Sequence, residues 1–279
     1  CGRGPRGTSG AGRRPVARRA RLGDTRGVDL AGKTILVTGA SRGIGAAIAR
    51  RCAEAGAHVV GHYGRDRAGA EAALSGHPHT LAEADAEHPE RMDGLWQAAL
   101  SATGRLDAVV LNAAIFLPKG GIEAPIEEWE EAWERQLRVN TLSPARLLRH
   151  AARHFAAAGG GVIVAISSWV AQRGAGSEAT IAYAASKAAL KAAAQTVARH
   201  YASRGVLTYI VAPGVVRTRM SLDAAAIAPG GEAAVTAGLA MREWVPPEEI
   251  ADLVAYLCTG RCRHLAGATL DVNGATYIR

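Results

Sequence analysis

Tyr183 and Lys187 stand four positions apart in an alanine-rich segment whose pattern predicts a helix over residues 182–201. Residues four apart lie on one face of a helix, a single turn from each other. An ammonium group beside a phenol favours the phenolate and lowers the pKa of the phenol from its usual value of about 10. The pair therefore indicates general acid–base chemistry. The alternative is a tyrosine packed at a helix start and a lysine in solvent.

Other polar side chains follow apolar runs that predict strands. A serine pair ending in Ser168 follows residues 161–166, and Asn112 follows the run over residues 106–111. The carboxyl ends of parallel strands share one edge of a sheet, and ligands bind beyond that edge. We therefore expect these side chains to share one cleft with Tyr183. The alternative is that they only terminate their strands.

A glycine-rich turn lies between an apolar run that begins at Lys33 and an alanine-rich helical pattern. Gly39 allows a tight turn, Gly43 lets backbone N–H groups approach a diphosphate, and Gly45 lets the helix pack closely on the strand. The unpaired N–H groups and the dipole at the helix start favour an anion. We expect a nucleotide cofactor at this turn, the alternative being glycines that are needed for steric reasons alone.

Strand and helix patterns alternate from Lys33 to the C-terminus, which predicts a parallel sheet with helices on both faces. Residues 126–158 are apolar on one side and charged on the other, and they predict one extended helix, bent where Pro144 interrupts it. Residues 215–244 have poor periodicity, and we interpret them as a mobile substrate flap. Neither an internal repeat nor a second domain is indicated.

The formal net charge of +8 is concentrated at the start of the chain. Residues 1–27 hold eight arginines and one acidic residue, so the other 252 residues carry a net charge of only +1. The segment is rich in Gly, Arg and Pro, and we expect a disordered basic tail followed by one folded domain over residues 28–279. Nucleic-acid binding through the tail is an alternative, but the tail has no aromatic residues for base stacking.

The four cysteines follow no repeated metal-ligand spacing. We expect free thiols in a reducing compartment and no metal site. No apolar run approaches the ~20 residues of a membrane span, and no apolar stretch follows the Arg13–Arg14 pair as an export signal would require. The sequence therefore favours a cytoplasmic protein that binds neither membranes nor nucleic acid.

The segment Tyr183-Ala184-Ala185-Ser186-Lys187, downstream of Ile166-Ser167-Ser168 and of the glycine turn, strongly resembles the short-chain dehydrogenase/reductase family. The resemblance runs from about Lys33 to near the C-terminus. Together with the alternating pattern, it implies an α/β protein with a single doubly wound Rossmann domain. Its sheet would be seven-stranded and mostly parallel, with helices on both faces.

The resemblance also implies the site residues. Ser168 would hold the reacting oxygen, Tyr183 would transfer the proton, and Lys187 would lower the pKa of Tyr183 and hold the nicotinamide ribose. Asn140 would anchor a water that relays protons. This catalytic set is Asn140, Ser168, Tyr183 and Lys187. The predicted cofactor contacts are Gly39, Ser41, Arg42, Gly43, Ile44, Gly45, Tyr63, Arg65, Asp85, Asn112, Tyr183, Lys187, Pro213, Gly214 and Thr218.

The choice of nicotinamide cofactor depends on the end of the second predicted strand, residues 58–63. An acidic residue there would hold the ribose 2′-hydroxyl of NAD, whereas an arginine accommodates a 2′-phosphate. The strand ends without an acid and is followed by Arg65, and Arg42 adds a second cation from the glycine turn. The sequence therefore favours NADP over NAD, unless both arginines are simply solvated.

The substrate is less closely defined than the reaction. The resemblance is closest to reductases of 3-oxoacyl thioesters, and sugar, polyol or steroid dehydrogenases of the same family are alternatives. A non-catalytic NADP-sensing regulator is an alternative of another class, but the complete Asn, Ser, Tyr and Lys set argues against it. The resemblance further implies a homotetramer or homodimer that acts on a small carbonyl compound or alcohol.

Overall fold

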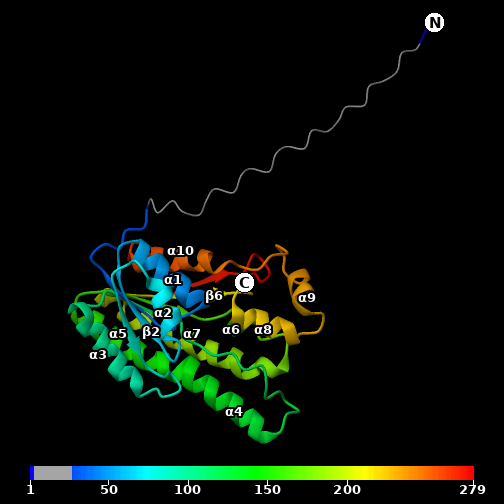
Figure 1. Cartoon of the computed structure of the whole chain (residues 1–279), viewed down its shortest axis with the longest axis horizontal. Helices are drawn as coiled ribbons and strands as arrows, with labels where there is room; N and C mark the ends of the chain where they lie inside the picture. Colours follow the sequence, from blue (N-terminus) through cyan, green and yellow to red (C-terminus); the bar gives the residue numbers. More distant parts are fainter. Residues whose placement is uncertain (3–26) are drawn as a thin grey trace.

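The computed structural model describes residues 1–2 and 27–279, so the tail predicted at the start of the chain lies almost entirely outside the described residues. The described chain forms one seven-stranded parallel sheet with helices on both sides (Figure 1). The strand order β3-β2-β1-β4-β5-β6-β7 reverses direction between β1 and β4. This confirms the predicted doubly wound fold.

Short β-branched runs form the strands, since both faces of this sheet are covered and accept apolar side chains. The central strands are buried along their whole length. The strands are β1 (Thr34–Val37), β2 (His58–Tyr63), β3 (His79–Glu83), β4 (Ala108–Leu111), β5 (Gly161–Ile166), β6 (Val206–Pro213) and β7 (Thr269–Val272).

The helices are α1 (Gly43–Glu54), α2 (Arg67–Leu74), α3 (Arg91–Thr103), α4 (Ile126–Leu137), α5 (Ser143–Ala157), α6 (Val170–Arg173), α7 (Ile181–Tyr201), α8 (Arg219–Ile227), α9 (Gly231–Ala237) and α10 (Pro247–Cys258). Apolar side chains of α1, α2 and α10 pack on one face of the sheet, and those of α3, α5 and α7 pack on the other. The two cores therefore cover both faces of the sheet.

The helix predicted over residues 126–158 is interrupted, but not at its proline. One π-helical turn, Arg138–Leu142, separates α4 from α5. Pro144 follows two residues after this turn, and because it has no backbone N–H it cannot donate to the carbonyl of Asn140 one turn earlier. The interruption therefore precedes the predicted position by two residues, and the irregular turn contains Asn140.

Residues 215–244, which we call the flap, contain the two helices α8 and α9 and are more regular than predicted. Val216 and Val245 form an isolated parallel bridge at the base of the flap. Trp244 is buried, and its Nε1 donates to Thr236 Oγ1 at 2.8 Å. The flap thus has a small core of its own, while its mobility stays a prediction.

Across the described residues, no helix is both long enough and apolar enough to cross a membrane. The same part of the chain contains no group of three or more His, Cys, Asp or Glu side chains that could hold a metal ion. Its cysteines are free thiols, and Cys52 and Cys258 are buried.

Candidate active site

The glycine turn joins β1 to α1 at the carboxyl edge of the sheet. Gly39 and Gly43 have φ angles of +70° and +58°, in the left-handed region that favours glycine. A Cβ at Gly45 would overlap the carbonyl oxygen of Gly39 and lie 2.5 Å from Asn112 Nδ2. The first residues of α1 therefore lie directly against the turn. They line a cleft there, which makes a cradle for an anionic group.

Thr38 and Asn112 lock this turn to the end of β4. Thr38 Oγ1 donates to the carbonyl of Val110 at 3.1 Å. It accepts from the backbone N–H groups of Asn112 and Ala113 at 2.8 and 3.0 Å. The Asn112 side chain donates back to the carbonyl of Thr38 at 2.8 Å. Asn112 therefore has a structural role in addition to its predicted place in the cleft.

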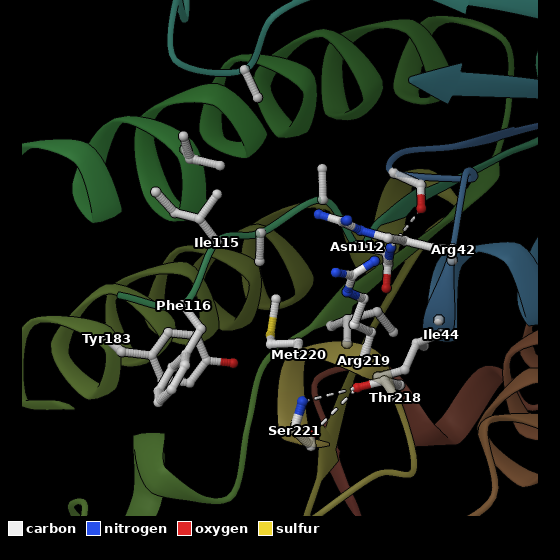
Figure 2. Close-up of a pocket in the computed structure, with 18 of the residues that line it drawn as sticks. Arg42, Ile44, Asn112, Ile115, Phe116, Tyr183, Thr218, Arg219, Met220 and Ser221 are labelled. Atoms are coloured by element: carbon white, nitrogen blue, oxygen red, sulfur yellow. Dashed lines mark hydrogen bonds between the residues drawn. The ribbon is translucent and has the colours of Figure 1, made fainter. Parts of the chain in front are cut away.

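The turn opens onto a cleft of about 880 Å³ at the carboxyl edge of the sheet (Figure 2). Strand ends, the loop after β4, α7 and the flap form its walls. Two predicted site residues, Tyr63 and Asn140, are not part of its lining. The predicted site residues that line it are Gly39, Ser41, Arg42, Gly43, Ile44, Gly45, Arg65, Asp85, Asn112, Ser168, Tyr183, Lys187, Pro213, Gly214 and Thr218.

Ser168, Tyr183 and Lys187 meet in this cleft. The Tyr183 ring packs edge to face on Phe116 with the ring centroids 5.0 Å apart, and its hydroxyl points into the cleft (Figure 2). Ser168 lines the same cleft, and its hydroxyl acts to lower the pKa of this phenol. Lys187 is only 2% exposed, and its Nζ lies 6.0 Å from the centroid of the Tyr183 ring. The four-residue spacing therefore brings the phenol and the amine to the same side of α7.

The predicted lowering of the Tyr183 pKa is wrong for this structure. Burial raises the pKa of Tyr183 to about 12, and the hydrogen bond with Ser168 offsets only part of the rise. Burial also lowers the pKa of Lys187 to about 8, because the ammonium group is removed from water. Lys187 Nζ donates to the carbonyl of Ile166 at 2.9 Å. The phenol is therefore a protonated acid at neutral pH.

The buried Lys187 should make the stability of the fold depend on pH. Between pH 8 and pH 10.5 the unfolded chain keeps the Lys187 proton while the folded chain loses it. Below pH 8 the folded chain carries the full cost of burying the ammonium group. The free energy of unfolding therefore rises with pH between pH 8 and pH 10.5. We expect a rise of about 3 kcal/mol relative to Lys187→Met, which has no such proton. Urea unfolding of both proteins between pH 8 and pH 10.5 measures this rise. An equal pH dependence of the free energy of unfolding in the two proteins would contradict the prediction.

Asn140 is fully buried in the π turn, behind the lining of the cleft. Its Oδ1 accepts from the N–H of Ile115 at 2.8 Å. Its Nδ2 donates to the carbonyl of Ile115 at 2.9 Å and to Ser186 Oγ at 3.0 Å. Both N–H donors of the carboxamide are thus taken, so a water held by Asn140 would have to donate to one of its oxygens, and the predicted water stays a prediction. The side chain also positions the backbone of the loop after β4.

Tyr63 lies outside the cleft lining, and its neighbour His62 takes the cleft position. Successive residues of a strand face opposite sides of the sheet. The Tyr63 hydroxyl lies 3.3 Å from Glu83 Oε2 and accepts from Arg67 at 3.1 Å. His62 is 2% exposed and lines the cleft. The predicted site residue Tyr63 therefore does not face the cleft; its neighbour His62 does, which strand alternation could have found.

Arginines line the cleft between the glycine turn, the end of β2 and α8. Arg65 lies 3.7 Å from Asp85, but its side chain is 86% exposed, so this ion pair contributes little stability. Arg42 and Arg219 direct their guanidinium groups into the same part of the cleft (Figure 2). Arg219 was not predicted, and it directly follows Thr218, the N-cap of α8. Together with the glycine cradle, these cations fit a ligand that carries phosphates.

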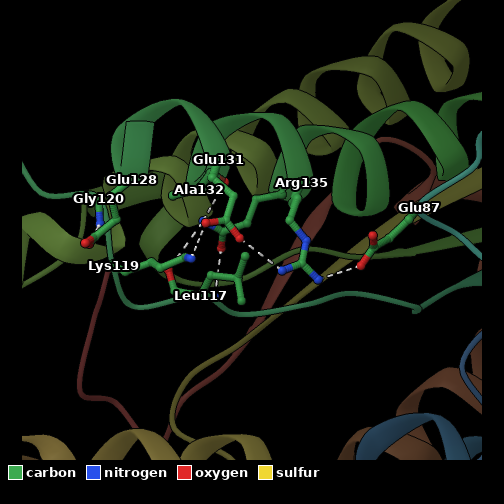
Figure 3. Close-up of polar contacts among 9 residues, drawn as sticks. Glu87, Leu117, Lys119, Gly120, Glu128, Glu131, Ala132 and Arg135 are labelled. Carbon is green, nitrogen blue, oxygen red and sulfur yellow. Dashed lines mark hydrogen bonds and ion pairs between the residues drawn. The ribbon is translucent and has the colours of Figure 1, made fainter. Parts of the chain in front are cut away.

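The loop after β4, residues 112–121, is tied to α4 (Figure 3). Lys119 Nζ lies 2.6 Å from Glu131 Oε2, and the N–H of Gly120 donates to Glu128 Oε1 at 2.8 Å. The loop is therefore a preformed wall of the cleft.

Apolar side chains continue this wall beside Tyr183. Met220 faces Tyr183 and Phe116 across the cleft (Figure 2). Met220 and Ile227, both from α8, are 39% and 69% exposed. An apolar part of a substrate would remove such side chains from water, whereas a fully polar substrate would gain nothing from contact with them.

A protein-family model described as Enoyl-(Acyl carrier protein) reductase matches residues 39–275. Among curated proteins, 3beta-hydroxysteroid dehydrogenase 1 of Eggerthella lenta is 33% identical over 262 residues. The match covers 90% of this chain and 95% of that protein. The similarity therefore extends over the whole folded part of the chain.

Solved structures of similar proteins contain nicotinamide cofactors of both kinds. The 3-oxoacyl (acyl-carrier-protein) reductase of Agrobacterium tumefaciens C58, with NADP bound, superimposes with a TM-score of 0.80 at 30% identity, covering 91% of this chain and 97% of that one. The 3-ketoacyl-(acyl-carrier-protein) reductase of Brucella melitensis, complexed with NADH, has a TM-score of 0.79 at 28% identity, covering 90% and 100%.

Proposed function

Because the chain belongs to the short-chain dehydrogenase/reductase family of oxidoreductases, we propose that it transfers a hydride between NADP(H) and a carbonyl compound or secondary alcohol. The observation that carries this proposal is the meeting of Ser168, Tyr183 and Lys187 in the cleft that the glycine turn also lines. The nicotinamide supplies the hydride when it is bound. The chain orients the reactants and moves one proton.

Ser168 and Tyr183 act on the reacting oxygen. Ser168 donates a hydrogen bond to the carbonyl oxygen, and Tyr183, protonated at neutral pH, gives its proton to the same atom during reduction. Lys187 lies close enough to the phenol ring to favour the phenolate that this transfer leaves. Oxidation of an alcohol needs the phenolate first, so we propose that neutral pH favours reduction.

The proposed preference for NADP depends on Arg42 and Arg65. An arginine that pairs with a 2′-phosphate contributes about 1.5–3 kcal/mol, so Arg42→Ala and Arg65→Ala should each raise the Kd for NADPH at least about tenfold. NADH lacks this phosphate, and its Kd should change much less. Fluorescence titration with both cofactors measures the ratio.

Arg67→Ala is the matched control for these two variants. Arg67 is two residues from Arg65, but it donates to the Tyr63 hydroxyl and does not line the cleft. The ratio of the two Kd values should stay at the wild-type level. If Arg65→Ala and Arg42→Ala weaken NADPH and NADH equally, the cofactor preference has another origin.

We propose a 3-oxoacyl thioester as the first substrate to test, and a ketosteroid as the second. Both have the apolar flank that Phe116, Met220 and Ile227 would cover, and sugars and polyols do not. The relatives named above include enzymes of both kinds. These three side chains therefore favour the two classes over a sugar or polyol.

A substrate panel followed at the nicotinamide absorbance tests the function. It compares a 3-oxoacyl thioester, a ketosteroid, an aldose and a polyol, each with NADPH or NADP as its oxidation state requires. We expect reduction of one of the first two. Turnover of only the sugar or polyol would overturn the substrate class, and no turnover of any carbonyl or alcohol would overturn the reaction.

The proposed enzyme is a homotetramer or homodimer in the cytoplasm. The small residues on the outer side of α7, such as Ala188 and Ala192, are not buried in the chain itself, which supports close approach of a second copy. Light scattering after size-exclusion chromatography measures the assembly, and a monomeric mass would contradict it.

A further inference from the structure

His62, at the cleft end of β2, joins two parts of the site that are distant in sequence. Its Nδ1 accepts from the N–H of Gly39 at 3.1 Å. Its Nε2 donates to the carbonyl of Ala84, directly after β3, at 2.8 Å. The imidazole is 2% exposed and lines the cleft. It therefore bridges the glycine turn and the end of β3.

These two contacts require the neutral imidazole with its proton on Nε2, since Nδ1 must accept and Nε2 must donate. Protonation of His62 would place an N–H on Nδ1, directly opposite the N–H of Gly39. Burial lowers the pKa of His62, while its hydrogen bond to Ala84 and the Asp85 carboxylate act in the opposite direction. The neutral ring is thus the form that holds the turn in place.

The charged groups on the neighbouring elements are few. Asp85 follows β3 and is paired with Arg65 after β2, and Asp66 caps α2 by accepting from Gly69. Arg42 belongs to the glycine turn and directs its guanidinium into the cleft. The residues that share a second, small cavity with His62 are all uncharged: Thr38, Ala86, Met92, Ala113, Val139, Ser143, Pro144 and Leu147. Asp85 is therefore the charge that acts on the imidazole.

We propose that His62 is a positioning residue of the cofactor site, which fixes the glycine cradle relative to the adenosine side of the cleft. The inference rests on the proposed nicotinamide-dependent function. Without an acceptor at Nδ1, the N–H of Gly39 loses its partner, while Thr38 stays bonded to the end of β4 and the N–H of Ala40 stays bonded to the carbonyl of residue 62. The peptide of Gly39 is then less firmly held than its two neighbours. The Ser168, Tyr183 and Lys187 group does not contact His62, so the effect falls on cofactor affinity and not on the chemical step.

Three variants separate the two contacts of the imidazole. His62→Asn keeps an acceptor close to the place of Nδ1, His62→Gln keeps a polar group close to the place of Nε2, and His62→Leu keeps neither. At about pH 7.5 we expect the Kd for NADPH to rise about tenfold in His62→Leu, with kcat at saturating cofactor within about twofold of wild type. His62→Asn should restore more of the affinity than His62→Gln.

The pH profile gives a second readout, which a merely structural role would not produce. As the pH falls below about 6.5, the wild-type Kd for NADPH should rise more steeply than that of His62→Asn, because burial lowers the pKa of His62 from its usual value and the acceptor of Asn does not titrate. The 2′-phosphate of the cofactor titrates in the same way with both proteins, so its effect cancels when the wild-type Kd is divided by the Kd of His62→Asn at each pH. His58→Asn is the control, because His58 lies on the same strand and contacts Thr80 at 2.9 Å, away from the cleft.

Each outcome decides the inference. The inference would be overturned by a wild-type Kd in His62→Leu or by an equal loss of affinity in His58→Asn. Better rescue by His62→Gln than by His62→Asn, or parallel pH profiles, would overturn it as well. In each case the proposed function stays intact as long as the wild-type protein binds NADPH. If His62→Leu does not fold, the comparison of the Asn and Gln variants still decides. Failure of the wild-type protein to bind NADPH or NADH would overturn the proposed function itself.

Discussion

Tyr183→Phe should lower kcat for carbonyl reduction by about a thousandfold or more and leave the Kd for NADPH nearly unchanged. The substitution removes only the hydroxyl that points into the cleft beside Ser168. The ring keeps its edge-to-face contact with Phe116, so the wall of the cleft should keep its shape. Saturating turnover and a direct NADPH titration on the same preparation separate the chemical step from binding.

Tyr209→Phe is the matched control. Tyr209 is fully buried in the sheet, its hydroxyl donates to the carbonyl of Cys262 at 2.9 Å, and burial also raises its pKa to about 12. Losing that hydroxyl should cost about 1 kcal/mol of stability and leave kcat unchanged. Wild-type turnover in Tyr183→Phe, or an equal loss in Tyr209→Phe, would show that the proton comes from another group.

The Tyr183 and Lys187 pair shows what residue spacing can and cannot predict. A separation of four residues reports that two side chains share a helix face, and in the structure they do. The direction of a pKa shift depends also on desolvation, which comes from the strands and loops packed around α7. Burial dominates here and raises the pKa of the phenol. A spacing argument therefore located the pair correctly and predicted the wrong direction of the shift.

The fold was largely predictable because its signals are local. Strand patterns, the glycine turn and the alternation of strands with helices are each contained in short segments. Pro144 indicated an interruption close to the π turn, but the hydrogen bonds of Asn140 with Ile115, 25 residues away in the chain, could not be read from any local pattern. The helices of the flap were missed because α8 buries only Ala225 and α9 buries none of its residues, so neither has an apolar periodicity.

Gly45→Ala should raise the Kd for NADPH by more than about a hundredfold and lower the free energy of unfolding. The new Cβ would overlap the carbonyl oxygen of Gly39 and lie 2.5 Å from Asn112 Nδ2. The Gly39 atom belongs to the backbone, and Asn112 is held by Thr38, so neither can yield easily. The start of α1 must then move away from the turn, and the cradle for the diphosphate opens.

Gly94→Ala makes the same chemical change at a site where nothing should oppose it. Gly94 lies within α3, and no atom outside its own turn of helix lies within 4 Å of the place its Cβ would take. Alanine is favoured over glycine in a helix by about 1 kcal/mol, so this variant should be slightly more stable than wild type and bind NADPH normally. Thermal unfolding and NADPH titration of both variants measure the contrast. Both variants add the same methyl group, and only Gly45→Ala places it between α1 and the glycine turn. If the two variants bind NADPH equally well, the close approach of α1 to the turn does not govern cofactor binding.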